Sequence, residues 1–129
     1  MQRIMLVAKI HQCRLTGTDL DYEGSITIDA DLLGTAGILP GEQVHVLNLA
    51  TGARLETYAI EGTAGTGVVA LNGAAARLGE IGDRLIILAY ASMTTAQART
   101  YEPRIVRVDD HNHPTGGPDD RAVKRGHDG

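Results

Sequence analysis

The N-terminal segment alternates between apolar and other side chains, with a period of two over residues 3–14. Lys9, His11 and Cys13 fall on one face of this pattern. The other face carries the apolar residues Ile4, Leu6, Ala8 and Ile10. Alternation that includes β-branched residues predicts a β-strand.

Shorter segments with strand or helix patterns follow along the chain. Further strands are predicted at residues 25–28, 43–49, 54–60, 68–71, 84–90 and 104–108. Short helices are predicted at residues 29–36, 73–78 and 92–99. Asp29 or Asp31 is the expected N-cap of the first helix, and Gly37 is its expected C-terminal glycine.

Two segments of the chain resemble each other. Residues 39–47 and residues 80–88 each contain a glycine, then an acidic residue, then an apolar strand. Such a repeat supports a small barrel with internal pseudo-two-fold symmetry. We therefore expect an all-β protein with short helices.

Composition narrows the class of protein. The chain of 129 residues has no Trp and no Phe, so its core must be aliphatic, and base-stacking platforms for single-stranded nucleic acid are disfavoured. The net charge is −4 and the basic residues are scattered, which favours neither a nucleic acid nor a membrane surface as partner. Cys13 is the only cysteine, and we expect it in the core. The sequence shows no signal peptide or membrane-spanning run, so we expect a cytoplasmic protein.

The chain changes character after residue 108. Residues 1–108 are expected to form the barrel, whereas residues 109–129 are polar and are expected to form a mobile tail. His111 and His113 are metal-ligating residue types. Together with His127, however, they are better interpreted as solvated tail residues than as a metal site.

Four blocks carry candidate chemistry. In chain order they are Lys9-Ile10-His11, Asp21-Tyr22-Glu23-Gly24-Ser25, Arg54-x-x-Thr57-Tyr58 and Asn72-Gly73-Ala74-Ala75-Ala76. A Gly-Ser pair alone is common in turns. The order and spacing of all four blocks resemble the aspartate 1-decarboxylase family from about residue 1 to residue 108.

The resemblance implies a self-cleaving proenzyme. Cleavage between Gly24 and Ser25 would give chains 1–24 and 25–129, with Ser25 converted to a pyruvoyl group. In the family, this group forms a Schiff base with L-aspartate and accepts electrons as CO2 leaves, which yields β-alanine for pantothenate synthesis. The chain has only Lys9 and Lys124 as lysines and no recognisable phosphate loop, which disfavours pyridoxal phosphate as the electron sink. No metal is expected.

The resemblance also assigns roles to the third block. Tyr58 is the implied proton donor, and a phenol with a pKa of about 10 is protonated at neutral pH, as this role requires. Thr57 is implied in cleavage and in substrate binding. Arg54 and Lys9 are implied to hold the two substrate carboxylates, and which cation holds which stays open.

Strand geometry bears on these roles. Arg54 and Tyr58 are predicted to share a strand face, whereas Thr57 points away unless a bulge, a strand end or a second site intervenes. Without the resemblance, Arg54 is better interpreted as a surface arginine paired with Glu56 or Glu61. Tyr58 would then be an ordinary half-buried strand tyrosine.

The remaining site residues have weaker assignments. Gly73, Ala74 and Ala75 are expected to bind substrate with Asn72, because backbone N–H groups at a helix start attract carboxylates. Plain helix capping by Asn72 explains the same pattern. The supporting residues without an assigned step are His11, Tyr22 and Glu23.

The fold implied by the resemblance is a six-stranded double-psi β-barrel with short helices, assembled as a homotetramer with sites between subunits. Whether maturation needs an accessory factor stays open. A small barrel that binds a partner and never cleaves is the main alternative, which the second and third blocks disfavour. A serine or aspartyl hydrolase is a further alternative, which no nucleophile–base–acid set supports.

Overall fold

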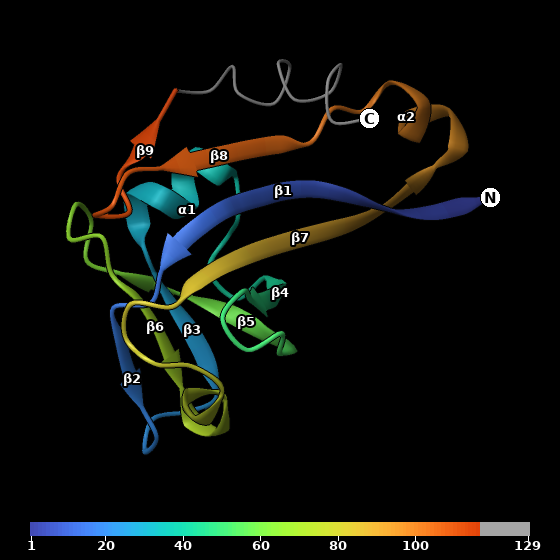
Figure 1. The fold of residues 1–129 in the computed structure, drawn as a ribbon. Helices are drawn as coiled ribbons and strands as arrows, with labels where there is room; N and C mark the ends of the chain where they lie inside the picture. Colours follow the sequence, from blue (N-terminus) through green and yellow to red (C-terminus); the bar gives the residue numbers. More distant parts are fainter. Residues whose placement is uncertain (117–129) are drawn as a thin grey trace.

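A computed structural model describes residues 1–116, in which strands dominate (Figure 1). The strands are β1 (Gln2–Arg14), β2 (Gly17–Asp19), β3 (Ser25–Asp29), β4 (Gln43–Asn48), β5 (Arg54–Gly62), β6 (Val69–Asn72), β7 (Arg84–Thr94), β8 (Arg104–Val108) and β9 (Pro114–Thr115). The helices are α1 (Ala30–Ala36), the 3-10 helix η1 (Gly73–Leu78) and α2 (Thr95–Thr100). The all-β prediction is confirmed.

The strands form one sheet that closes on itself. Their order is β2-β6-β3-β5-β4-β7-β1-β8-β9, and β1 lies between β7 and β8 (Figure 1). The chain continues from β1 across to β6, where the backbone N–H of Thr16 donates to the carbonyl of Val69 at 2.7 Å and β2 then pairs with β6. If β1 and β2 are counted as one path, β1/β2, β3, β4, β5, β6 and β7 form a closed ring of six, and β8 and β9 extend it beside β1.

The two similar segments form matching turns. Gly41 and Gly82 both adopt left-handed backbone angles, with φ of 88° and 98°. Glu42 and Asp83 each accept a hydrogen bond from the backbone N–H three residues earlier, at 2.9 and 3.0 Å. The strands that follow these turns, β4 and β7, pair with each other in antiparallel fashion. The repeat in the sequence therefore corresponds to a local two-fold relation in the barrel.

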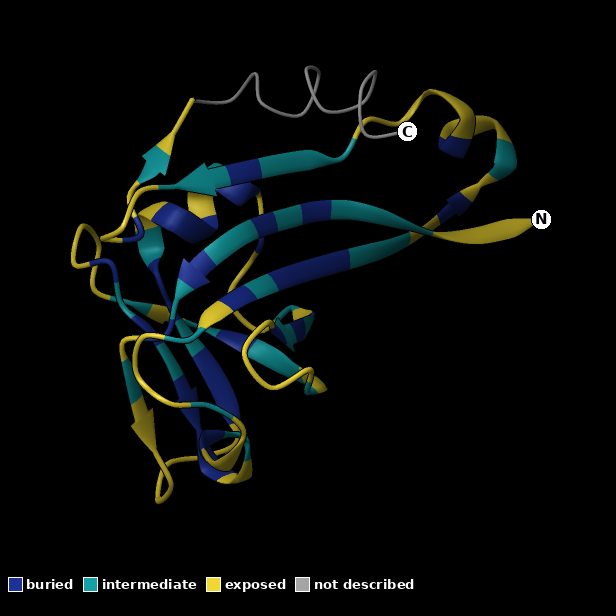
Figure 2. Ribbon diagram, in the orientation of Figure 1, coloured by how far each residue is buried: buried dark blue, intermediate teal, exposed yellow. Residues whose placement is uncertain are grey.

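A bulge in β1 changes the predicted alternation. Between Ile10 and Cys13 the register with β7 shifts, and Gln12 adopts a left-handed φ of 58°. Cys13 therefore joins Ala8 and Ile10 in the core and does not lie on the face predicted for it. Its predicted burial is confirmed, and burial raises the pKa of the Cys13 thiol to about 12. Figure 2 shows in dark blue the buried stretches along β1, β3 and β7.

Asp29 joins the end of β3 to a distant loop. Its carboxylate caps α1 by accepting from the backbone N–H of Asp31 at 2.7 Å, so Asp29 is the N-cap of the two candidates, Asp29 and Asp31. It also accepts from Gly65 at 3.1 Å and from Gly67 at 2.7 Å. Gly37 ends α1 with a left-handed φ of 74°, as predicted. The buried Asp29 carboxylate thus connects two parts of the chain that are far apart in sequence.

Packed structure continues past residue 108, where we expected the polar tail to begin. Asn112 is buried, accepts from the backbone N–H of Arg14 at 2.7 Å, and donates to the carbonyl oxygens of Arg14 and Gly67 at 2.8 Å each. His127 and the rest of residues 117–129 lie outside the described residues. Within residues 1–116 there is no group of three or more potential metal-ligating side chains, and no helix is long and apolar enough to cross a membrane.

Candidate active site

The predicted cleavage point lies where an exposed loop enters the barrel. Ser25 is the first residue of β3 and is fully buried, whereas Gly24 before it is exposed. The Ser25 hydroxyl donates to the carbonyl oxygen of Glu23 at 2.9 Å and accepts from the side-chain amide of Asn72 at 3.0 Å. The same amide donates to the hydroxyl of Thr27 at 2.9 Å. These contacts hold the Ser25 oxygen in one place, beside the peptide bond predicted to break.

Asn72 does not act as the helix cap that one reading of the sequence predicted. It occupies the residue before η1, but its side chain makes no capping hydrogen bond. Strands β3 and β6 pair with Ser25 opposite Asn72, so the Asn72 amide reaches the Ser25 hydroxyl instead. The buried amide therefore belongs to the site.

Tyr58 lies beside the same loop. The half-buried Tyr58 donates its phenol hydroxyl to a carboxylate oxygen of Glu23 at 2.5 Å. Strands β3 and β5 run parallel with Ile26 opposite Ala59, so the residues just before this pair, Ser25 and Tyr58, enter the barrel side by side. The hydrogen bond to Glu23 raises the pKa of the Tyr58 phenol, and burial adds to the effect. The phenol is therefore kept protonated.

The glycine that the local geometry requires is Gly73. Its φ is +69°, and a Cβ placed on it would lie 2.8 Å from the Cα of Gly24 and 3.1 Å from the carbonyl oxygen of Tyr22. Gly24 has no positive φ, and a Cβ on it would meet nothing within 4 Å. The conformation that excludes a side chain therefore belongs to Gly73, which is the neighbour of Gly24 in space and not in sequence.

A cavity of about 710 Å³ opens at this point. Five of the predicted site residues line it, namely Gly24, Thr57, Tyr58, Ala74 and Ala75. Its remaining lining residues, which the sequence analysis missed as site residues, are Leu55, Glu56, Arg77 and Leu78. The register of β5 with β4 is unbroken from Arg54 to Tyr58, and its last pair joins Tyr58 to the first residue of β4. Thr57 thus lines the cavity from within β5, close to the point where its pairing with β4 ends, and without a bulge.

Three predicted residues lie away from this cavity. Arg54 is exposed, and its guanidinium lies 3.3 Å from a ring nitrogen of His45 and 3.5 Å from the hydroxyl of Tyr90. Lys9 lies on β1 opposite Leu88 of β7. His11 lines a different cavity.

Arg54 is a surface arginine, as the alternative interpretation required, but among the described residues it lacks the ion pair that this interpretation predicted. Among residues 1–116, Arg54 forms an ion pair with neither Glu56 nor Glu61. Instead, Glu56 accepts from the side-chain amide of Gln43 at 2.9 Å.

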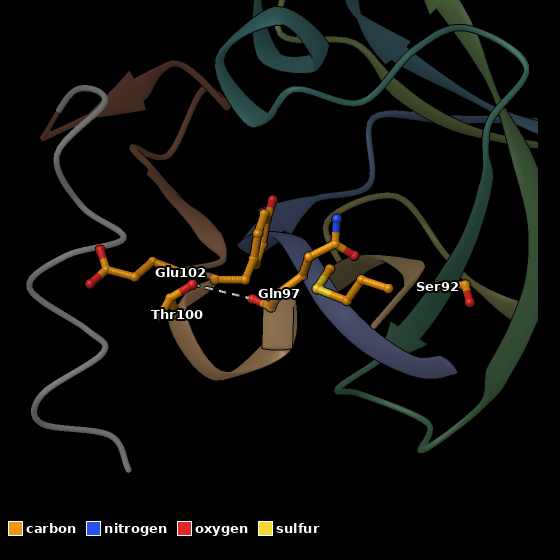
Figure 3. Close-up of a pocket in the computed structure, with 6 residues that line it drawn as sticks. Ser92, Gln97, Thr100 and Glu102 are labelled. Atoms are coloured by element: carbon orange, nitrogen blue, oxygen red, sulfur yellow. Dashed lines mark hydrogen bonds between the residues drawn. The ribbon is translucent and has the colours of Figure 1, made fainter. Parts of the chain in front are cut away.

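A further cavity of about 650 Å³ lies between β7 and α2, where Ser92, Gln97, Thr100 and Glu102 line it (Figure 3). It contains none of the predicted site residues. Five of the predicted site residues thus gather at the cavity around Gly24 and Tyr58 and not at this one.

The chain is thus an all-β barrel whose candidate site is built around the buried Ser25 hydroxyl, at the junction of Gly24 and Ser25. The sequence model of the family described as aspartate decarboxylase matches residues 1–115, so the chain belongs to that family.

Similar proteins share this family. An aspartate 1-decarboxylase of Thermoanaerobacter pseudethanolicus is 51% identical over 88% of this chain and 97% of its own length. One from Trichormus variabilis is 54% identical over 88% of this chain and 90% of its own. Aspartate 1-decarboxylase 1 of Gloeobacter violaceus is 57% identical over 87% of this chain and 95% of its own length. Among solved structures, the rationally designed mkDPBB_sym_86 protein matches 61% of this chain and 91% of its own, with a TM-score of 0.45 and 15% identity.

Proposed function

We propose that this chain is the proenzyme of a pyruvoyl-dependent decarboxylase, which converts L-aspartate to β-alanine and CO2 for pantothenate synthesis. Membership of the aspartate decarboxylase family supports this reaction. The observation that carries the proposal is the buried Ser25 hydroxyl, which Asn72 holds next to the Gly24–Ser25 bond in the same site as Tyr58. A biosynthetic role of this kind fits a cytoplasmic enzyme.

Self-cleavage starts from the Ser25 hydroxyl. Its oxygen attacks the carbonyl carbon of Gly24, the C–N bond breaks, and an ester joins the two residues. Loss of the Cα proton of residue 25 then breaks the Cβ–O bond, which releases Gly24 as a carboxylate and leaves dehydroalanine. Water converts the dehydroalanine to the pyruvoyl group with loss of ammonia. Thr57 lines the cavity with Gly24, and we assign its hydroxyl to the carbonyl oxygen during the attack.

The site suits a pyruvoyl group at the start of β3. That group supplies the electron sink that decarboxylation of an amino acid requires. Asn72 already donates to the Ser25 oxygen at this position, and it would hold a pyruvoyl carbonyl oxygen there through the same N–H. Tyr58 delivers the proton to the substrate carbon that loses CO2, and its hydrogen bond to Glu23 holds the phenol protonated beforehand. Gly73 and the cavity-lining Ala74 and Ala75 offer backbone N–H groups to the substrate.

The cations for the substrate carboxylates come from another face of the barrel. Leu47 of β4 pairs with Arg54 on one side and with Ile86 of β7 on the other. The half-buried Leu47 and Ile86 give this outward face an apolar surface next to Arg54 and Lys9. We propose a homotetramer in which this face of one subunit brings Arg54 and Lys9 to Ser25 of its neighbour. Mixing Arg54→Ala chains with Tyr58→Phe chains then restores part of the activity, since some mixed sites are intact.

The intact mass of the denatured protein tests maturation. Two masses that correspond to residues 1–24 and to a modified 25–129 are expected, and the cleaved protein is expected to release β-alanine from L-aspartate. Incubation with and without cell extract shows whether maturation needs an accessory factor. A single full-length mass after both incubations would contradict the proposal.

Two variants separate cleavage from turnover. Ser25→Ala is expected to remain uncut and inactive, because the hydroxyl is lost. Tyr58→Phe is expected to be cleaved but to turn over slowly, because only the proton donor is lost. Full activity of uncut Ser25→Ala would refute the pyruvoyl mechanism, and unimpaired turnover of Tyr58→Phe would remove Tyr58 from its role.

A further inference from the structure

A second polar cavity, of about 320 Å³, lies at the far end of β1. Arg14 of β1, Arg84 of β7 and Arg107 of β8 all line it, and we call it the arginine cavity. It shares no lining residue with the cavity around Gly24 and Tyr58. Nothing in the proposed decarboxylation uses these three arginines.

The strand register forces like charges together in the arginine cavity. Arg14 lies directly opposite Arg84 across β1 and β7, and Arg107 lies opposite His11 across β1 and β8. Like charges that face each other across strands are destabilising. A cluster of three arginines on three neighbouring strands therefore needs negative charge nearby.

The protein supplies little of that charge within residues 1–116. Arg14 donates to the neutral backbone carbonyl of Gly82 at 3.2 Å, and its guanidinium lies 3.9 Å from a carboxylate oxygen of Asp110, which is a long contact to an exposed group. Arg84 donates to the neutral side-chain amide of Gln12 at 3.4 Å. Asp109 also lines the cavity, but one of its carboxylate oxygens already accepts from two backbone N–H groups of its own turn, at 2.8 and 3.0 Å. The Arg107 side chain has no hydrogen bond or ion pair with any described residue.

The bulge in β1 contributes to the shape of this cavity. Two residues of β1, His11 and Gln12, occupy the space opposite a single residue of β7, so both line the cavity although they are adjacent in sequence. Gln12 achieves this with a φ of 58°, which is uncommon for a residue other than glycine. Unusual backbone angles of this kind gather at functional sites.

We propose that the arginine cavity binds a phosphate-bearing small molecule. Three guanidinium groups that approach from three strands match an anion with three terminal oxygens, as in a phosphate monoester, whereas a carboxylate offers two. The cavity volume leaves room for a small organic group beside the phosphate. This site is additional to the proposed function and does not depend on it.

Calorimetric titration of the full chain with inorganic pyrophosphate, at low and constant ionic strength, tests the proposal. We expect saturable binding of one anion per chain. Arg107→Gln and Arg84→Gln are each expected to weaken binding by about tenfold, because each removes one charge-assisted contact. Malonate, which presents carboxylates only, is expected to bind more weakly than pyrophosphate.

The matched control is Arg99→Gln, which removes the same charge from the exposed face of α2. It is expected to leave pyrophosphate binding unchanged. Absence of saturable binding at millimolar pyrophosphate would overturn the proposal. If Arg99→Gln weakened binding equally, the effect would come from the overall charge of the protein, and the arginine cavity would be ruled out as the site. Malonate binding as tightly as pyrophosphate would overturn the assignment to phosphate. None of these readouts involves cleavage or L-aspartate, so the result is independent of the proposed function.

Discussion

Replacing Gly73 with alanine probes how tightly the barrel holds the cleavage loop. Gly73 combines a left-handed φ of +69° with close contact, since an added Cβ would lie 2.8 Å from the Cα and 2.9 Å from the backbone nitrogen of Gly24. Both contacts are to backbone atoms, which cannot rotate away from the added methyl group as the end of a flexible side chain can. The new methyl group must therefore displace Gly24, η1 or both.

The expected cost of Gly73→Ala has two parts. A left-handed backbone costs a residue other than glycine about 1–2 kcal/mol. Forcing a methyl group into filled space costs about 1–3 kcal/mol more. Gly52 isolates the first part, because its φ is 78° and an added Cβ would meet nothing within 4 Å. Gly73→Ala should therefore lower the free energy of unfolding by roughly 1–3 kcal/mol more than Gly52→Ala does.

Two assays follow the two consequences. Urea unfolding is measured with each glycine variant combined with Ser25→Ala, so that every chain stays uncut. Self-cleavage is measured by intact mass with Ser25 present. We expect Gly73→Ala to cleave more slowly than Gly52→Ala, because displacement of Gly24 moves its carbonyl carbon away from the Ser25 hydroxyl. Equal destabilisation by the two variants, together with equal cleavage rates, would refute the argument that Gly73 sets the position of the loop.

Three further changes test other contacts. Burial alone would raise the pKa of Asp29, but the backbone N–H groups that donate to its carboxylate outweigh burial and lower this pKa. The ionised Asp29 therefore stabilises the fold above about pH 4, and this contribution is lost as the pH falls through the lowered pKa of the folded state. The difference in unfolding free energy between the wild type and Asp29→Asn should shrink below that pH, and a constant difference would contradict this account. Glu23→Gln, in uncut Ser25→Ala chains, should move the ultraviolet titration of Tyr58 to lower pH, with Tyr58→Phe identifying its signal; an unmoved titration would mean that Glu23 does not raise that pKa. Asn112→Ala should lower the free energy of urea unfolding by about 1–3 kcal/mol, because it leaves buried backbone groups of Arg14 and Gly67 without partners, and no change in unfolding would exclude that role.

Local patterns predicted much of the fold. Alternation identified most strands, and the glycine–acidic repeat identified two equivalent turns, because side-chain period and left-handed turns are properties of neighbouring residues. The bulge at Gln12 was not predictable in this way, since an inserted residue leaves the alternation on either side intact. Cys13 was therefore assigned to the wrong face.

The sequence predicted which residues make up the candidate site better than it predicted the hydrogen bonds between them. The family motif supplied Ser25 and Tyr58, but the bond between Tyr58 and Glu23 joins residues 35 apart and depends on the pairing of β3 with β5. Local capping chemistry predicted that the Asn72 side-chain oxygen would cap η1, but Asn72 makes no capping bond, and the pairing of β3 with β6 places its side-chain N–H group on the Ser25 hydroxyl. Arg77 was missed because a basic residue in the last turn of a helix is ordinary by itself.

The position of β1 in the sheet determines what cleavage does to the molecule. In the proposed maturation, the segment ahead of the cut contains a 13-residue strand held between β7 and β8, so it would be a structural subunit of the product and not a discarded propeptide. Once the bond is broken, unfolding separates two molecules and refolding must bring them together again. The stability of the mature protein then depends on its concentration. Since residue 25 of the proposed mature form is no longer a serine, a preparation that loses the short chain could not regenerate the original continuous polypeptide.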